Sequence, residues 1–377
     1  MSLSVGVIGG GQLARMMIAP AVELGIDLRV LAETEGMSAA LAATDIGDYH
    51  DAHRVLTFAR GVDVVTFDHE HVPQRVLTAL VDAGVTVRPG PHALQFAQDK
   101  LLMRARLAEL DVPQPDWIGA SDRTQISRFL DAHGGCAVIK TPRGGYDGKG
   151  VRLVSAADQA DDWLAEFGTI LVEERVEFSR ELAQQIARRP SGEVRAYPVV
   201  ETVQRDGVCA EVIAPVPSAA QGTSSRVQRV TAGVGVTIAE GLDVSGMLAV
   251  ELFETTDERV LVNELAMRPH NSGHWSQDGA HTGQFEQHLR AVLDLPLGDT
   301  APHAAWSVMV NVLGGPVAGM VAHLPAAMSA HPEAKIHSYG KPYRPGRKVG
   351  HVTVCGDDLD DVVYRARATA ATFAAER

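Results

Sequence analysis

Two glutamates lie in short apolar segments that indicate neighbouring strands. Glu251 belongs to a segment at 248–254 and Glu264 to one at 260–265. If the intervening turn is centred just after Asp257, the two glutamates stand directly opposite each other, with Cβ atoms about 5 Å apart. Carboxylates this close repel each other, and hard oxygen ligands suit Mg²⁺. The hairpin therefore predicts one or two magnesium ions, whereas a different turn centre would offset the pair.

A glycine-rich loop is the second feature whose residues could bind a ligand. A strand-like segment at 137–140 ends in Lys140 and continues as Thr-Pro-Arg-Gly-Gly-Tyr-Asp-Gly-Lys-Gly at 141–150. Glycine amides can approach phosphate closely, and Arg143 and Lys149 would balance its charge. The spacing is not that of a P-loop, and an exposed hairpin turn is the alternative. Because a buried lysine without a partner is costly, Lys140 favours phosphate binding.

Polar side chains also follow the second glutamate strand. The segment Arg268-Pro-His270-Asn271-Ser272 is dense in hydrogen-bond donors. Arginine prefers phosphate or carboxylate, and the other three side chains can orient a polar substrate. A lone histidine is usually structural, but this run beside a predicted metal site favours a substrate contact.

The strand-like segment at 170–176 ends in two acids, Glu173 and Glu174, and Glu181 opens the next strand. Such a segment can line an adenine slot, where backbone groups meet the base edge and an acid accepts ribose hydroxyls. From the residues alone an ordinary edge strand is an equal alternative.

The N-terminus carries the pattern Gly9-x-Gly11-x-x-Ala14 after an apolar strand, and Glu33 ends the next strand. This pattern matches the dinucleotide fingerprint, so a NAD-dependent oxidoreductase is an alternative function. The pattern by itself indicates only phosphate binding, because a glycine turn at a helix N-terminus suits any phosphate. A tight strand-to-helix turn without a ligand is the structural alternative.

Alternating strands and helices indicate a parallel α/β unit over residues 1–92. Its strands are expected at 5–8, 28–31, 62–67 and 85–87, and one long helix is expected from Ala93 to Leu110. From about residue 113, strands joined mostly by turns indicate antiparallel sheets, including one strand at 196–202. A smaller third block follows at 301–377, so the predicted units are 1–92, 93–300 (with a small lobe at about 113–178) and 301–377.

Composition narrows the functional classes. The chain has 377 residues with 34 Lys and Arg against 47 Asp and Glu, a formal charge of −13. Such an acidic chain is not expected to bind nucleic acid or an anionic membrane. Three scattered cysteines and the lack of an apolar run of about 20 residues favour a cytoplasmic protein.

Taken together, these segments resemble the ATP-grasp superfamily and, within it, the 5-(carboxyamino)imidazole ribonucleotide synthases. The resemblance covers essentially the whole chain, and it rests on GGGQLARM, FDHEHV, GGYDGKG, LVEERVEFSREL, VELF, VNELAMRPHNSGHW and YGKPYRPGRKVGHV. It implies an ATP-grasp fold of mixed α/β and α+β class. That fold has a Rossmann-like pre-ATP-grasp domain, a two-lobed ATP-grasp region and a small C-terminal domain.

The resemblance also implies a ligase of purine biosynthesis that acts as a homodimer. ATP, bicarbonate and 5-aminoimidazole ribonucleotide would give the N-carboxylated ribonucleotide, ADP and phosphate, with carboxyphosphate as the intermediate and Mg²⁺, in two ions, as the metal. Another ATP-grasp ligase, similar to the formate-dependent glycinamide ribonucleotide transformylase, remains an alternative, as does a non-catalytic nucleotide-binding protein.

Site residues implied by the resemblance fall into four groups. Lys100 and Lys140 would contact phosphates, under a flap formed by Gly145, Tyr146, Asp147, Gly148, Lys149, Gly150 and Val151. Glu173, Glu174, Arg175 and Val176 would line the adenine edge, with Glu181 at the ribose, Gln204 and Asn263 at the nucleotide, and Glu251 and Glu264 at the metal. The catalytic residues would be Tyr146, Asp147, Lys149, Arg268 and His270. Substrate would be bound by Gly11, Gln12, Leu13, Glu70, Asn271, Ser272, Lys341, Arg347 and Lys348.

Two positions depart from the family pattern. Many ATP-grasp enzymes carry a metal-binding asparagine two residues after the second glutamate, where this chain has Ala266. The metal shell must therefore depend on Glu251 and Glu264. The family often places a histidine where this chain has Gln204, which leaves the nucleotide contact of that residue open.

Overall fold

The computed structural model of the chain describes residues 2–145, 149–205, 207–217, 221–314 and 319–374. Three residues of the predicted flap, Tyr146, Asp147 and Gly148, lie outside this part of the chain. None of the helices within the described ranges is both long enough and apolar enough to cross a membrane.

The N-terminal unit is a four-stranded sheet in the order β3-β2-β1-β4, and all of its pairings are parallel. This confirms the predicted parallel α/β unit. The expected strand at 85–87 is wrong in its extent, because only a single bridge joins Val87 to Val65. The elements are β1 (Ser4–Ile8), α1 (Gln12–Glu23), β2 (Asp27–Ala32), β3 (Ala43–Ile46), α2 (Ala52–Phe58), β4 (Val64–Phe67) and α3 (Gln74–Asp82).

The glycine turn before α1 is filled by a carboxylate of the chain itself. Asp68 is placed directly after β4, and its Oδ1 accepts a hydrogen bond from the Ala14 amide at 2.7 Å. Glu33 accepts one from the Gly10 amide at 3.0 Å. Gly11 has no room for a side chain, because a Cβ there would lie 1.9 Å from Asp68 Oδ2. The positive end of α1 is thus compensated within the protein.

The long helix expected from Ala93 to Leu110 is in fact two helices, α4 (Pro91–Gln98) and α5 (Lys100–Glu109). Asp99 separates them in an extended conformation, with φ −131° and ψ 111°. Its Oδ1 accepts from the Leu101 and Leu102 amides at 3.0 and 3.1 Å, so Asp99 caps α5. An aspartate favours this N-cap geometry over a helix interior, which explains the break.

A small lobe follows, built on a four-stranded antiparallel sheet in the order β5-β8-β6-β7. Its core includes Ile126 and Phe129 of α6, packed with Ile139 and Val172 of the sheet. The elements are β5 (Trp117–Ala120), α6 (Arg123–Ala132), β6 (Ala137–Lys140), β7 (Val151–Val154), α7 (Asp161–Phe167) and β8 (Ile170–Glu174).

One antiparallel sheet of nine strands carries the rest of the chain, in the order β14-β13-β9-β11-β12-β15-β17-β16, with β10 beside β9. The strand expected at 196–202 is divided into β10 and β11. β12 pairs with β15, so the C-terminal block continues the same sheet. The strands are β9 (Phe178–Arg188), β10 (Val194–Ala196), β11 (Val200–Arg205), β12 (Val208–Ala214), β13 (Gly246–Thr255), β14 (Val260–Ala266), β15 (Trp306–Leu313), β16 (Lys335–Ser338) and β17 (Lys348–Gly356).

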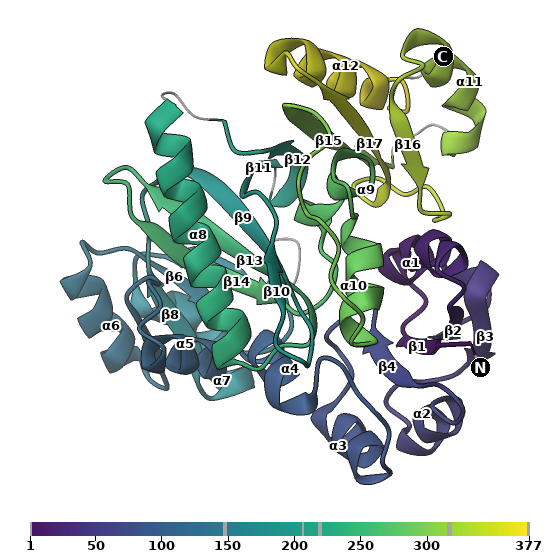
Figure 1. The fold of residues 1–377 in the computed structure, drawn as a ribbon. Helices are drawn as coiled ribbons and strands as arrows, with labels where there is room; N and C mark the ends of the chain where they lie inside the picture. The colour runs from purple at the N-terminus through teal and green to yellow at the C-terminus, as the bar shows by residue number, and fades with distance from the viewer. Residues whose placement is uncertain (1, 146–148, 206, 218–220, 315–318, 375–377) are drawn as a thin grey trace.

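Helices cover this sheet and connect it to the N-terminal unit (Figure 1). α10 lies beside α1, and the C-terminal block lies above α1 in this view. One apolar cluster runs from Phe67 of β4 through Leu107 of α5 to Leu248 of β13 and Ile238 of α8, so the units share a core. The helices are α8 (Gln221–Gly241), α9 (Ser276–Gly279), α10 (Gln284–Val292), α11 (Leu324–Ala330) and α12 (Leu359–Ala371).

The packing of Asp68 against the glycine turn leads to a stability prediction. Gly11→Ala should lower the melting temperature, because the new methyl group would collide with the half-buried carboxylate of Asp68. Gly233→Ala is the matched control, since Gly233 lies in α8 with open space around its Cβ position. Replacing a helix-interior glycine by alanine stabilises by about 1 kcal/mol. Equal melting temperatures for the two variants would contradict the proposed packing.

Candidate active site

The two predicted metal ligands face each other in the hairpin of β13 and β14. Glu251 pairs with Glu264, which confirms the predicted register at this position. The assumed turn centre is wrong, however, because near the turn Leu252 pairs with Val262. Asn263 is an extra residue between the two registers, and this β-bulge brings the glutamates opposite each other. A bulge also re-aims its side chains, here those of Asn263 and Glu264.

The electrostatics of Glu251 match those of a cation site. Burial, followed by the neighbouring carboxylates of Glu264 and Glu181, raises the pKa of Glu251 to about 8. A divalent ion beside these carboxylates would stabilise the ionised form of Glu251. Among the described residues no three His, Cys, Asp or Glu side chains are already grouped as a metal site. The two facing carboxylates would therefore share a metal with ligand oxygens.

Lys140 is buried, as predicted, but it is not without a protein partner. Its Nζ lies 2.7 Å from Glu173 Oε2 and donates to Asn263 Oδ1 at 2.9 Å. Burial by itself would raise the pKa of Glu173, but the Lys140 and Arg104 cations outweigh it and hold this pKa below its usual range. The Glu173 carboxylate therefore binds these two cations, so only the backbone of Glu173 could contact the edge of an adenine base.

Lys100 contacts the start of the predicted flap. The Lys100 ammonium donates to Gly144 O at 3.0 Å and lies 3.7 Å from Glu264. Arg143 donates to Asp99 Oδ2 at 2.9 Å, so the residue that interrupts the helix also holds the start of the loop. The far end of the loop returns through Gly150, whose carbonyl accepts from the Thr141 amide at 3.0 Å.

Glycine is required at both described ends of this loop. Gly145 and Gly150 have φ values of +81° and +76°. A Cβ on Gly145 would also lie 2.5 Å from the Lys149 carbonyl oxygen. Val151 follows at the start of β7, where it pairs with Lys140. The residues that flank the loop therefore stand beside the predicted phosphate-binding lysine.

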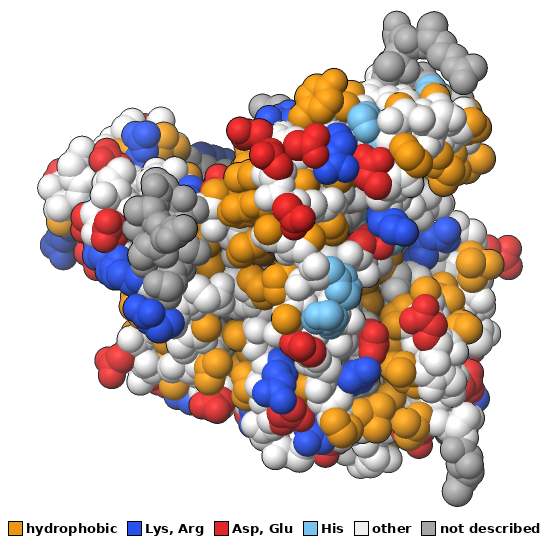
Figure 2. All heavy atoms as spheres, turned by 45° about the horizontal axis from the view of Figure 1, so that its top comes forward, with side chains coloured by type: hydrophobic (Ala, Val, Ile, Leu, Met, Phe, Trp, Pro, Cys, Tyr) orange, Lys and Arg blue, Asp and Glu red, His pale blue; other side chains and the backbone are white. Residues whose placement is uncertain are grey.

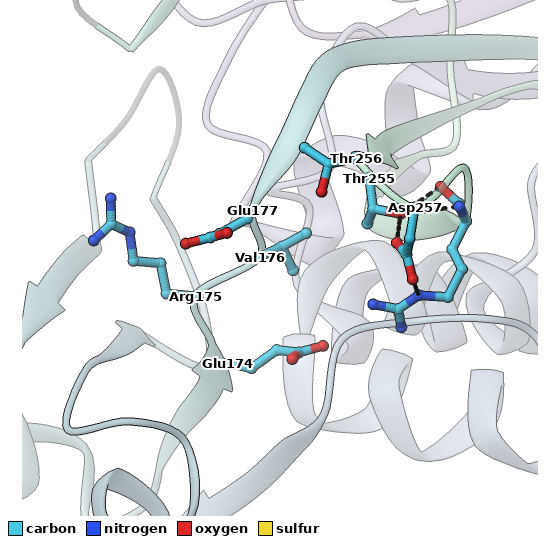
Figure 3. A pocket seen from close by; sticks show the side chains of 8 residues that line it. Glu174, Arg175, Val176, Glu177, Thr255, Thr256 and Asp257 are labelled. Carbon is cyan, nitrogen blue, oxygen red and sulfur yellow. Dashed lines mark hydrogen bonds and ion pairs between the residues drawn. The ribbon is translucent and has the colours of Figure 1, made fainter.

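The predicted adenine edge lines a pocket beside the turn of the β13–β14 hairpin. Figure 3 shows Glu174 and Val176 on one side and Thr255 with Asp257 on the other, while Arg175 extends away from that turn. The Glu174 carboxylate accepts from the Asp116 amide at 3.2 Å. The remaining lining residues are Glu177, Thr256 and Arg259.

Glu181 and Gln204 lie together, on β9 and β11. Partial burial raises the pKa of Glu181, although a hydrogen bond from Gln204 opposes the rise. Gln204 therefore reaches the proposed ribose-binding acid.

Phe253 is a site residue that our sequence analysis missed. It pairs with Glu181 and lies two residues from Glu251 on β13, so the three side chains share one face of the sheet. Phe178 stacks on it with ring centroids 4.7 Å apart. The alternation within Val-Glu-Leu-Phe would have placed Phe253 beside the metal ligand.

The polar run after β14 is anchored by Arg268. Its Nε lies 2.7 Å from Glu70 Oε2, which joins this run to the segment after β4. His270 Nδ1 lies 2.8 Å from Ser272 Oγ, and His270 Nε2 lies 3.6 Å from Glu251 Oε1. Both side-chain amide atoms of Asn271 are buried, and the amide lies within hydrogen-bonding reach of the Cys209 thiol.

His270 is neutral at physiological pH. Burial, reinforced by the Arg268 and Lys348 cations, lowers its pKa to about 3. A neutral imidazole can accept a hydrogen bond from a bound substrate, but a pKa this low makes it a weak base.

The predicted ribonucleotide-binding residues come from opposite ends of the chain. Lys341 Nζ donates to Gln12 Oε1 at 2.6 Å, across 329 positions of sequence. Arg15 of α1 donates to the Ser338 carbonyl at 3.0 Å, so the C-terminal block is docked on the first helix. Leu13 is buried within α1.

Two further basic residues were predicted at this end of the chain. Lys348 begins β17, and its charge contributes to the low pKa of His270. Arg347 directly precedes it, and its backbone carbonyl accepts from the Gly314 amide at 2.7 Å. Figure 2 shows acidic and basic side chains intermixed on the face it displays, with histidines near its centre. The net charge of −13 therefore does not appear as a uniformly acidic surface on this face.

The geometry of the glycine turn at Gly9–Gly11 gives little support to dinucleotide binding. Asp68 and Glu33 accept the Ala14 and Gly10 amides that a pyrophosphate would otherwise use. The structure thus disfavours the oxidoreductase alternative.

Three family models match successive parts of the chain. A ribonucleotide synthetase preATP-grasp domain matches residues 2–98, an ATP-grasp domain matches 105–285, and a phosphoribosylaminoimidazole carboxylase C-terminal domain matches 307–365.

Curated relatives and solved structures agree with these matches. N5-carboxyaminoimidazole ribonucleotide synthase of Mycobacterium bovis is 48% identical over 97% of this chain and 86% of its own. The enzyme of Corynebacterium ammoniagenes is 46% identical over 97% and 91%. The synthetase structure from Thermus thermophilus has a TM-score of 0.86 at 34% identity, covering 99% of both chains.

A further solved structure is a complex of the Aspergillus clavatus synthase with ADP and 5-aminoimidazole ribonucleotide. It has a TM-score of 0.87 at 28% identity, covering 99% of this chain and 98% of its own. Fold and sequence thus agree over nearly the full length: the chain belongs to the N5-carboxyaminoimidazole ribonucleotide synthase family of ATP-grasp enzymes.

Proposed function

We propose that the protein carboxylates 5-aminoimidazole ribonucleotide, using ATP and bicarbonate and releasing ADP and phosphate. The observation that carries this proposal is that the facing pair Glu251 and Glu264 adjoins both a lysine set and a separate polar set. Lys100 lies 3.7 Å from Glu264, and His270 lies 3.6 Å from Glu251. The hairpin thus stands between groups suited to ATP and groups suited to a second substrate.

Bicarbonate is a poor electrophile, so it must be activated. A bicarbonate oxygen attacks the γ-phosphorus of ATP, the bond to the β-phosphate oxygen breaks, and ADP leaves carboxyphosphate behind. The exocyclic amine of the ribonucleotide then takes up the carboxyl carbon, either directly or after release of carbon dioxide, and phosphate departs. The protein must align the reactants, neutralise charge and exclude water.

The chain's own residues would divide these tasks. Lys100 and Lys140 would hold the ATP phosphates, while Phe253 and the segment at 174–176 would hold the base. Arg268 would bind the anionic bicarbonate, and neutral His270 would accept a hydrogen bond from a substrate. Asn271 and Ser272, together with Glu70, would orient bicarbonate and the aminoimidazole.

The phosphate of the ribonucleotide would bind where the two ends of the chain meet. Gln12 and Lys341 are already in contact there. Gly11 and Leu13 would contribute backbone groups, and Arg347 and Lys348 would add positive charge. Tyr146, Asp147 and Lys149, of which the first two lie outside the described residues, would cover the reactants.

Magnesium would be held by Glu251 and Glu264. The raised pKa of Glu251 and the facing geometry fit a divalent cation, and its ligands would include phosphate oxygens of ATP. When bound, the metal would neutralise charge on the transferring phosphoryl group. We further infer that the protein is a homodimer, as the resemblance implies, and that it is cytoplasmic, as its three scattered cysteines favour. Sedimentation tests the first inference, and cell fractionation tests the second.

The substrate assignment predicts a specific dependence of ADP release. ADP should appear only when ATP, Mg²⁺, bicarbonate and 5-aminoimidazole ribonucleotide are all present, measured by a coupled assay. Glycinamide ribonucleotide with formate tests the alternative ligase, and biotin tests a third acceptor. Faster release with either would overturn the proposal, and ATP binding without any turnover would favour a non-catalytic protein.

The metal assignment predicts the effect of a single substitution. Glu264→Ala should lower kcat/KM for ATP by about 100-fold or more, because the facing carboxylates would no longer hold the metal that stabilises the phosphoryl charge. Glu258→Ala is the matched control, since this exposed glutamate of the same hairpin pairs with Arg226. Near-normal ADP release by Glu264→Ala would show that the metal role is wrong.

The ribonucleotide assignment predicts a selective change in KM. Lys341→Met should raise the KM for 5-aminoimidazole ribonucleotide by about tenfold and leave the KM for ATP unchanged, because one charge-assisted phosphate contact is lost. Lys335→Met, at an exposed position of β16, serves as the control. Equal changes in both KM values would argue against a phosphate contact at Lys341.

A further inference from the structure

The Arg104 guanidinium lies beneath the proposed nucleotide site and contacts both of its halves. Arg104 belongs to α5 and is 0% exposed. Its Nε donates to Glu173 Oε1 at the end of β8 in the small lobe. Its two terminal nitrogens donate to the carbonyls of Val262 and Asn263 on β14, at 2.7 and 2.9 Å. One buried side chain therefore joins the sheets that carry Lys140 and Glu264.

On the β14 side, Arg104 binds the bulge itself. The extra residue Asn263 interrupts the pairing with β13, and buried carbonyls at such an interruption need donors. The planar fork of a guanidinium donates to two successive carbonyls in a fixed geometry, whereas the donors of an ammonium rotate about a point charge. The fork fixes the backbone from which Asn263 and Glu264 project.

On the β8 side, Arg104 sets the orientation of Lys140 through Glu173. Each carboxylate oxygen of Glu173 has its own partner. Oε1 accepts a hydrogen bond from Arg104, and Oε2 lies at a distance of 2.7 Å from Lys140 Nζ. Lys140 also donates to Asn263 Oδ1 at 2.9 Å, which closes a ring of contacts through the bulge. An ammonium has three donors, so one N–H of Lys140 remains for a phosphate oxygen.

We propose that Arg104 is a positioning residue for the nucleotide site, which holds Lys140 and the Asn263–Glu264 pair in a single geometry. Arg104 touches no substrate and acts through Glu173 and the β14 bulge. The inference rests on the proposed function, since it assigns these residues to ATP phosphates and magnesium.

A purely structural ion pair is the competing explanation. Loss of such a pair would lower stability and the fraction of active protein without changing affinity in the folded molecules. A positioning role would change the affinity for nucleotide and metal while leaving ribonucleotide binding intact. Affinity measured on folded protein therefore separates the two.

The test uses Arg104→Met and Arg104→Lys in the full-length chain, with Arg106→Met as the matched control. Arg106 lies two residues further along α5, where it contacts Glu109 and the Gly241 carbonyl. The dissociation constant for ADP with Mg²⁺ is measured by calorimetry without other substrates. Arg104→Met should weaken it by about 10- to 100-fold. Arg104→Lys should fall between Arg104→Met and wild type, and Arg106→Met should match wild type.

A second readout is the KM for 5-aminoimidazole ribonucleotide, which should stay within about twofold in both Arg104 variants. If Arg104→Met does not fold, Arg104→Lys decides the question, because it keeps the buried charge but lacks the fork. Wild-type ADP affinity in a folded Arg104 variant would overturn the inference, as would failure of both variants to fold. Absence of ribonucleotide-dependent turnover in the wild type would instead overturn the proposed function.

Discussion

Two carboxylates facing each other on one side of a sheet impose the constraint around which this site is built. Ionisation of Glu251 is disfavoured by burial and by the facing Glu264 carboxylate, so positive charge brought between or beside the pair would stabilise the ionised form of Glu251. The basic groups nearby come from different parts of the chain, with Lys100 from α5 and Arg268 from the segment after β14. A site that attracts cations in its centre and anions at its edge suits a metal–nucleotide complex.

Much of this arrangement could be predicted from local patterns. The facing glutamates followed from strand alternation and a short turn, and the polar run after β14 was evident from its composition. The turn centre was wrong and the register at Glu251 was nevertheless right, because a bulge of one residue compensated for the error. A bulge leaves no clear signature in a single sequence, since it is set by contacts such as those of Arg104.

Other features depend on tertiary contacts that no local pattern contains. Asp99 was placed inside one long helix, although its capping preference makes a break between Gln98 and Lys100 reasonable in hindsight. The partner of Lys140 was expected to be phosphate alone, and Glu173 was expected at the adenine edge. Their mutual contact joins two strands of the small lobe and could be seen only once β6 and β8 were paired.

The contact between Gln12 and Lys341 has a consequence for biosynthesis of the protein. The two residues are separated by 329 positions. At a synthesis rate of about 5–20 residues per second, roughly 15 to 65 s pass between the appearance of the first and the second. The N-terminal sheet can form early on the ribosome, but the end of the site that it shares with the C-terminal block is completed only after that block is released. A nascent chain stalled before β17 would therefore contain most of the fold and only an incomplete substrate site.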